Sequence, residues 1–129
     1  MKKYQRFEDM PIWQMSRKLA QVIFELTQSE PFCRDFSLRD QINKAMGSVM
    51  DNIAEGFERD GNKEFVQFLS IAKGSAGEVR SQLYRASDRG YAMDFESLKD
   101  NISEVSRQIQ YLINYLKRTE YKGTKYVRT

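Results

Sequence analysis

NIAEGFERDGNKEFVQFLSIAKGSAGE, residues 52–78, ends one apolar helical pattern and begins a second one across the short turn ERDGN. Gly56 permits either a close helix approach or a left-handed exit, and the turn that follows is rich in turn-forming residues. We expect Asn62 to cap the second helix, whose first turn carries Glu64 at the favourable end of the helix dipole. The stretch therefore predicts two helices joined by a tight turn.

Four apolar patterns of this kind follow one another, and each has apolar residues three or four positions apart, as helices with one buried face do. Their members are Ile12, Met15, Leu19, Val22, Ile23 and Leu26; Ile42, Ala45, Met46, Val49 and Ile53; Phe65, Leu69, Ala72, Ala76, Val79, Leu83 and Ala86; and Leu98, Ile102, Val105, Ile109, Leu112 and Leu116. Four helices with short connections predict an all-α fold, an up-and-down antiparallel four-helix bundle formed by residues 1–129 as a single domain.

The helix ends carry recognisable signals. Pro11 suits the first turn of the first helix, where a missing N–H costs nothing. Ser37 with Asp40 resembles a capping box for the second helix. Gly90 is expected to follow the end of the third helix, and Asp94 to cap the fourth.

Two of the helices have more apolar side chains than one core face uses. Phe68 and Ile71 flank the third pattern, and Tyr111, Ile113 and Tyr115 flank the fourth. A helix that is apolar on two faces needs a second partner. We interpret this surplus as a subunit interface, so the sequence predicts a homo-oligomer.

Basic residues are concentrated in two terminal arms, residues 1–6 and 117–129. The arms hold eight Lys and Arg against one acidic residue, whereas residues 7–116 hold 13 basic residues against 17 acidic ones. Basic side chains neutralise phosphates, and tyrosines stack on exposed bases. The candidate nucleic-acid-binding residues are Lys2, Lys3, Arg6, Lys117, Arg118, Tyr121, Lys122, Lys125, Tyr126 and Arg128. In an antiparallel four-helix bundle the first helix starts where the fourth ends, so both arms should emerge together.

Catalysis and cofactor binding have little support. The chain has no histidine, which excludes Glu-x-x-His di-iron sites, catalytic Ser-His-Asp or Cys-His sets and ordinary zinc hydrolase sites. No phosphate-binding or dinucleotide-binding glycine motif is present. An acid–base pair of Glu55 with Glu64 or Glu78 is the remaining enzymatic alternative, but nothing in the sequence fixes the separation of these carboxylates. We expect a non-enzymatic protein with no cofactor and no metal.

The chain also lacks the features of secreted and membrane proteins. The N-terminal residues have charges but no apolar core region, and no apolar run approaches the roughly 20 residues of a membrane span. Cys33 is the one cysteine, and a lone thiol fits a reducing compartment. We therefore expect a cytoplasmic protein.

Three segments closely resemble a family of small bacterial proteins named for the intervening sequences of 23S ribosomal RNA genes. They are FEDMPIWQMSRKLA (7–20), LRDQINKAMGSVMDNIAEGFER (38–59) and KEFVQFLSIAKGSAGEVRSQL (63–83). The resemblance runs from about Phe7 to Tyr91, and the fourth helix matches only in pattern. It implies a four-helix bundle, often assembled as a ring of five, and kinship with retroelement accessory variability proteins, which bind nucleic acid.

The family supplies no established active site. Its signature positions here are Asn52, Glu55, Gly56, Glu64, Gly74, Ser75 and Glu78, all of which we interpret as structural. GSAG, residues 74–77, lies within a helical pattern, and we expect it to let two helices pack closely.

The leading hypothesis is an oligomer, a pentamer on the family resemblance, that binds RNA or other single strands through its arms. The alternatives are an oligomeric scaffold that holds only protein partners, and terminal arms that are merely solvated tails.

Overall fold

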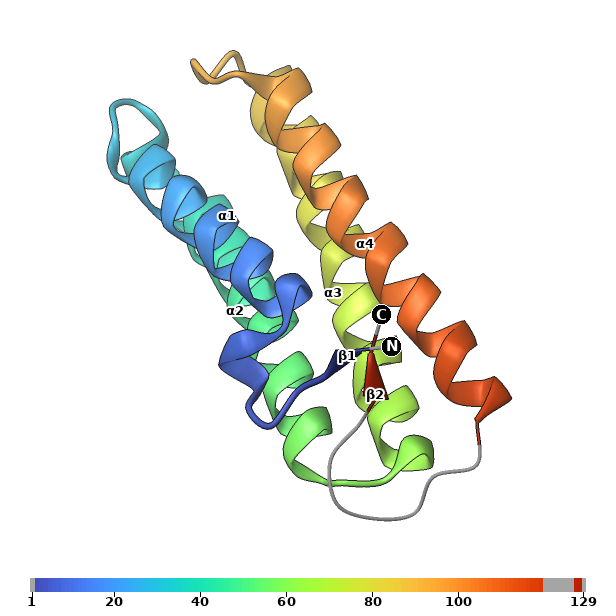
Figure 1. The fold of residues 1–129 in the computed structure, drawn as a ribbon. Coiled ribbons are helices and arrows are strands. Elements are labelled where there is room, and N and C mark those ends of the chain that lie inside the picture. Colours follow the sequence, from blue (N-terminus) through green and yellow to red (C-terminus); the bar gives the residue numbers. More distant parts are fainter. Residues whose placement is uncertain (1, 120–126, 129) are drawn as a thin grey trace.

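The computed structural model describes residues 2–119 and 127–128. Within these residues, four α-helices run alternately up and down, and each packs against its neighbours in the bundle (Figure 1), which confirms the predicted fold. The elements in chain order are β1 (Lys2–Lys3), η1 (Phe7–Asp9), α1 (Pro11–Gln28), η2 (Phe32–Arg34), α2 (Phe36–Glu58), α3 (Asn62–Asp88), α4 (Phe95–Arg118) and β2 (Val127–Arg128).

The core follows the predicted apolar patterns closely. Every predicted core residue of α2, α3 and α4 is buried, and α1 contributes Ile12, Leu19 and Ile23. Met15 and Leu26 are partly buried against the core. Val22 departs from the prediction, because 49% of its surface is exposed. It lies at the rim of a hollow between α1 and α4, which do not close fully over this side of the core.

The α2–α3 turn depends on a close approach of the two helices at Gly56. A Cβ atom there would lie 2.8 Å from Phe65 Cδ1 and 2.8 Å from Phe68 Cβ, so only glycine fits without movement. The left-handed backbone falls instead on Asp60, with φ of 56°. Of the two roles foreseen for Gly56, close approach is the one the structure confirms.

The predicted cap at Asn62 is wrong. Gly61 occupies the N-cap position of α3, and Asn62 is the first helical residue. The Asn62 side-chain amide instead donates hydrogen bonds to the carbonyl oxygens of Leu116 (3.0 Å) and Thr119 (2.9 Å). Carbonyls at a helix C-terminus lack intrahelical partners, so Asn62 ties the end of α4 to the start of α3.

At the opposite end of the bundle, the predicted capping box of Ser37 with Asp40 is also wrong. Asp35 caps α2, accepting a hydrogen bond from the Leu38 backbone N–H at 3.3 Å, and the Ser37 hydroxyl accepts one from Gln41. The other helix-end predictions are confirmed. Pro11 begins α1, Gly90 follows α3 with φ of 79°, and Asp94 caps α4 by accepting from the Ser97 N–H.

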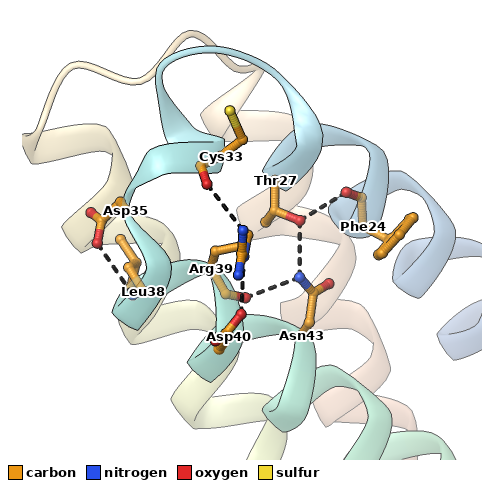
Figure 2. Close-up of polar contacts among 8 residues, drawn as sticks. All are labelled: Phe24, Thr27, Cys33, Asp35, Leu38, Arg39, Asp40 and Asn43. Atoms are coloured by element: carbon orange, nitrogen blue, oxygen red, sulfur yellow. Dashed lines mark hydrogen bonds and ion pairs between the residues drawn. The ribbon is translucent and has the colours of Figure 1, made fainter.

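Polar side chains fix the connection between α1 and α2 (Figure 2). The Asn43 amide donates to the Thr27 hydroxyl (2.9 Å), which itself donates to the Phe24 carbonyl (2.8 Å). Arg39 donates to the Cys33 carbonyl at 3.1 Å and so holds the intervening loop against α2. Thr27 is buried, and the bond from Asn43 satisfies a hydroxyl that would otherwise be costly there.

The surplus apolar residues divide into three groups. Ile113 is buried, so its assignment to a second face is wrong. Phe68 and Tyr115 are half-buried, and Tyr115 packs against the core. Ile71 and Tyr111 are 52% and 58% exposed, and these two remain candidates for a contact outside the bundle.

Candidate nucleic-acid interface

The two ends of the chain meet in a short antiparallel ribbon. β1 pairs with β2, with Lys2 opposite Arg128 and Lys3 opposite Val127. Two basic positions of the N-terminal arm and one of the C-terminal arm therefore share one ribbon (Figure 1). Four other predicted residues lie outside the described residues: Tyr121, Lys122, Lys125 and Tyr126.

The remaining basic residues of the arms are exposed but differ in their surroundings. Arg6 lies 3.5 Å from a Glu8 carboxylate oxygen and 3.9 Å from one of Asp9, so part of its charge is already compensated. Lys117 and Arg118 are exposed on the last turn of α4. The Arg118 guanidinium lies 5.9 Å from the centre of the Tyr115 ring, a cation–π distance.

An aromatic hollow connects the N-terminal segment with α4. It has a volume of about 50 Å³ and is lined by Tyr4, Met10, Pro11, Ile12, Gln108, Tyr111, Leu112 and Tyr115. Tyr4 directly follows the ribbon strand β1 and is buried in this contact. The ribbon is therefore anchored beside the last three turns of α4, which end in basic residues.

The outer face of α1 was not predicted as part of the site. A shallow hollow of about 510 Å³ opens there, lined by Pro11, Gln14, Met15, Arg17, Lys18 and Gln21. The sequence does carry a signal for it, since no acidic residue occurs between Asp9 and Glu25. This signal is weaker than that of the arms, which hold more basic residues in shorter segments.

A family model of 23S rRNA-intervening sequence proteins matches residues 8–111. The chain belongs to this family. The match extends into α4, which the quoted segments do not reach, and the family description names the RNA gene element without stating an activity. No curated protein matches the chain.

Among solved structures, the chain is similar to a crystal structure of a protein of unknown function from the S23 ribosomal protein family of Bacteroides thetaiotaomicron. The TM-score is 0.72 at 21% identity, over 79% of this chain and 97% of that one. At this identity the likeness concerns the fold alone.

The family's signature residues at the centre of α2 and α3 join the two helices. Asn52 donates its side-chain amide to the Ser48 carbonyl (2.8 Å) and hydroxyl (3.0 Å). The Ser48 and Ser75 hydroxyls share a hydrogen bond of 2.8 Å between α2 and α3. This polar contact supports the structural interpretation of Asn52 and Ser75.

We expected Gly74 to allow close packing of two helices, and this prediction is wrong. No atom lies within 4 Å of the place where a Gly74 Cβ would stand, and Gly77 is equally open. The close packing in GSAG comes from Ser75 and Ala76, which are buried, while the two glycines face outward.

The signature carboxylates lie on the surface. Glu55, Glu64 and Glu78 are all exposed, and Glu55 forms an ion pair of 2.9 Å with Arg59 one turn away. Residues 2–119 and 127–128 contain no group of three or more His, Cys, Asp or Glu side chains that could hold a metal ion. In the same part of the chain, no helix is long and apolar enough to cross a membrane.

A carboxylate with a lowered pKa, Asp35, lies at the end of the bundle remote from the arms. Asp35 accepts hydrogen bonds from the Tyr91 hydroxyl (2.8 Å) and from Arg89. These bonds, with Tyr91 the largest contributor, lower the pKa of Asp35 against the opposing effect of burial. Asp35 caps α2, and its partners Arg89 and Tyr91 follow α3. The contact therefore holds the start of α2 to the α3–α4 loop.

Proposed function

We propose that this protein is a non-catalytic, oligomeric member of its family that binds RNA or other single-stranded nucleic acid through its basic arms. The observation that carries the proposal is the β1–β2 ribbon, which places Lys2, Lys3 and Arg128 in one element. The ribbon stands beside the end of α4, where Lys117 and Arg118 are exposed. Positive charge gathered in this way releases counterions from a phosphate backbone.

Single strands suit the arms better than a DNA duplex. A sequence-specific duplex reader places a helix or ribbon in the major groove, with side chains directed at the base edges. The C-terminal arm alternates tyrosines with Lys and Arg instead, a composition suited to stacking on unpaired bases. The family description, which names an intervening sequence of 23S rRNA, makes structured RNA with single-stranded loops the first ligand to test.

The proposed oligomer is a homopentamer, and it is supported by exposed apolar side chains on α3 and α4. Ile71 and Tyr111 are more than half exposed, and exposed apolar surface of this kind is what a second chain would cover. Assembly would multiply the arms and gather them on one rim. Sedimentation equilibrium at micromolar concentration should show an oligomer, and a monomer alone would contradict this part of the proposal.

The binding test uses the intact chain and a charge variant of its C-terminal arm. Lys122, Lys125 and Arg128 are changed to Gln, which removes three positive charges and leaves the chain length unchanged. Each phosphate contact adds about 0.7 to the slope of log affinity against log salt for a single strand. Fluorescence anisotropy with a labelled 23S rRNA fragment should therefore show a slope about 2 lower for the variant. An equal slope for both proteins would move the site away from this arm.

The second candidate function is a protein-interaction scaffold. Phe24 and Phe36 are 55% and 63% exposed and lie near the end of the bundle remote from the arms. An apolar protein interface should tolerate added salt, whereas phosphate binding should weaken steeply with it. Failure of the intact protein to bind any RNA, combined with salt-resistant association with a protein, would favour the scaffold.

A further inference from the structure

The first half of α1 presents a polar outer face. Gln14, Arg17, Lys18 and Gln21 are all exposed and follow the i, i+3, i+4, i+7 spacing that places side chains on one side of a helix. Together with Pro11 and Met15 they line the shallow hollow of about 510 Å³.

The charge on this face is uncompensated. Among the arginines of residues 2–119, Arg17 and Arg118 alone have neither an ion pair nor a hydrogen bond to another side chain, and each lies over an aromatic ring. Arg17 stands 5.6 Å from the centre of the Trp13 ring. Lys18 likewise has no ion pair with a carboxylate among the described residues, and Glu104, which lines a neighbouring hollow with it, is bonded to Arg107 and Gln108.

The α1 face is continuous with the arms. Pro11 lines both its hollow and the aromatic hollow that contains Tyr4 and Tyr111. Tyr4 directly follows the β1 strand of the ribbon. The α1 face therefore begins at Pro11, beside the aromatic hollow that contains Tyr4, and Arg17 and Lys18 lie about two helical turns beyond Pro11.

We propose that this outer face of α1 extends the nucleic-acid site, so that a single strand leaving the arms lies along α1 with its phosphates on Arg17 and Lys18. The inference rests on the proposed function. It adds a second set of phosphate contacts, which substitutions on α1 can remove without changing the arms. Gln21 supplies an exposed amide donor and acceptor, and Gln14 keeps its carbonyl oxygen available while its amide donates to the Glu8 backbone carbonyl. A guanidinium stacked on an aromatic ring is held in place, so it loses little freedom when a phosphate binds.

The test compares Arg17→Gln/Lys18→Gln with a matched variant, Lys44→Gln/Lys73→Gln, which loses the same charge from α2 and α3. The probe is a labelled oligouridylate of about 16 nucleotides, the upper range for one single-strand binding domain. Removing two phosphate contacts lowers the salt slope by about 1.4. The affinity advantage of the intact protein over the α1 variant should then shrink about sevenfold between 50 and 200 mM salt.

The outcomes separate this inference from the function on which it rests. Weaker binding by the α1 variant with the lower slope, and unchanged binding by the control variant, support the α1 site. Equal binding by the α1 variant and the intact protein overturns the α1 site and leaves binding by the arms standing. Equal losses of affinity in the α1 variant and the control variant would mean that only the net charge matters, and this result also overturns the α1 site. If the intact protein does not bind the probe at either salt concentration, the proposed function and the α1 site fail together. Thermal melts of all three proteins establish that each is folded.

Discussion

Replacing Gly56 with alanine should destabilise the protein although the site lies within a helix. The new Cβ would stand 2.8 Å from Phe65 Cδ1 and from Phe68 Cβ, well inside the roughly 3.5–4.0 Å optimum for carbon contacts. Phe65 is fully buried and its ring packs edge-on against Phe57 at 6.2 Å. Phe68 Cβ is attached directly to the backbone, so the contact is relieved only when α2 and α3 move apart.

The size of the effect follows from two opposing terms. Overpacking in a well-packed core costs about 1–3 kcal/mol, whereas glycine to alanine within a helix gains about 1 kcal/mol. The expected net loss is therefore about 1 kcal/mol. With a urea m-value of roughly 1–3 kcal/mol/M for a small protein, the denaturation midpoint should fall by about 0.5 M.

Gly74→Ala is the matched control, because it makes the same substitution within a helix where the new methyl group meets open space. It should raise the free energy of unfolding by about 1 kcal/mol, so the two variants should shift the midpoint in opposite directions. Urea unfolding followed by circular dichroism at one protein concentration measures both. A midpoint for Gly56→Ala equal to or above that of the unchanged protein would refute the close-approach argument.

Three further substitutions test particular contacts. Asp35→Asn keeps a capping side chain but loses the carboxylate that accepts from Tyr91 and Arg89. Because those bonds lower the pKa of Asp35, their contribution is present above about pH 4 and is lost as the pH falls further, so the stability deficit of the variant should shrink below pH 4 in urea titrations. Asn62→Asp keeps the shape but removes the donor to the end of α4, and should cost about 1–3 kcal/mol and speed amide exchange in the last turn of α4. Glu78→Gln, on the exposed surface, should change stability by less than about 0.5 kcal/mol, and a larger loss would reveal a contact outside the bundle.

Apolar periodicity predicted the helices and most of the core, because a buried helix face repeats every three or four residues whatever its neighbour is. It could not predict that Val22 would stay exposed, since the repeat does not tell how tightly α1 and α4 close over it. The caps failed for a related reason. Asp35 and Ser37 offer similar local chemistry, and the choice between them depends on Tyr91 and Arg89, which are more than 50 residues away in the chain.

The candidate site was predictable in part. Charge counting identified the arms, and the even number of helices predicted that they would meet. The ribbon itself was not predictable, because strands of two residues are too short for an alternating pattern. The α1 face was not predicted because two basic residues in an acid-free run are common. The structure adds that Arg17 lies over the Trp13 ring and that Arg17 and Lys18 line one exposed face of α1.

The arms and the α1 face can bind one strand together or act as two independent binding sites. A protein that carries the substitutions of both variants distinguishes these two cases. Independent sites give additive losses of binding free energy, whereas contacts along one strand that must be engaged together do not. The Lys122→Gln/Lys125→Gln/Arg128→Gln variant alone should lower the salt slope by about 2, and Arg17→Gln/Lys18→Gln by about 1.4. With a probe long enough to reach both surfaces, their combination should lower affinity by less than the product of the separate losses, because a strand released from the arms is no longer held beside α1. A probe of about 4 nucleotides, the shortest site size for a single-strand binding fold, cannot reach both surfaces, so one of the two losses should vanish with it. Strict additivity with the long probe would mean that the two surfaces do not share a strand.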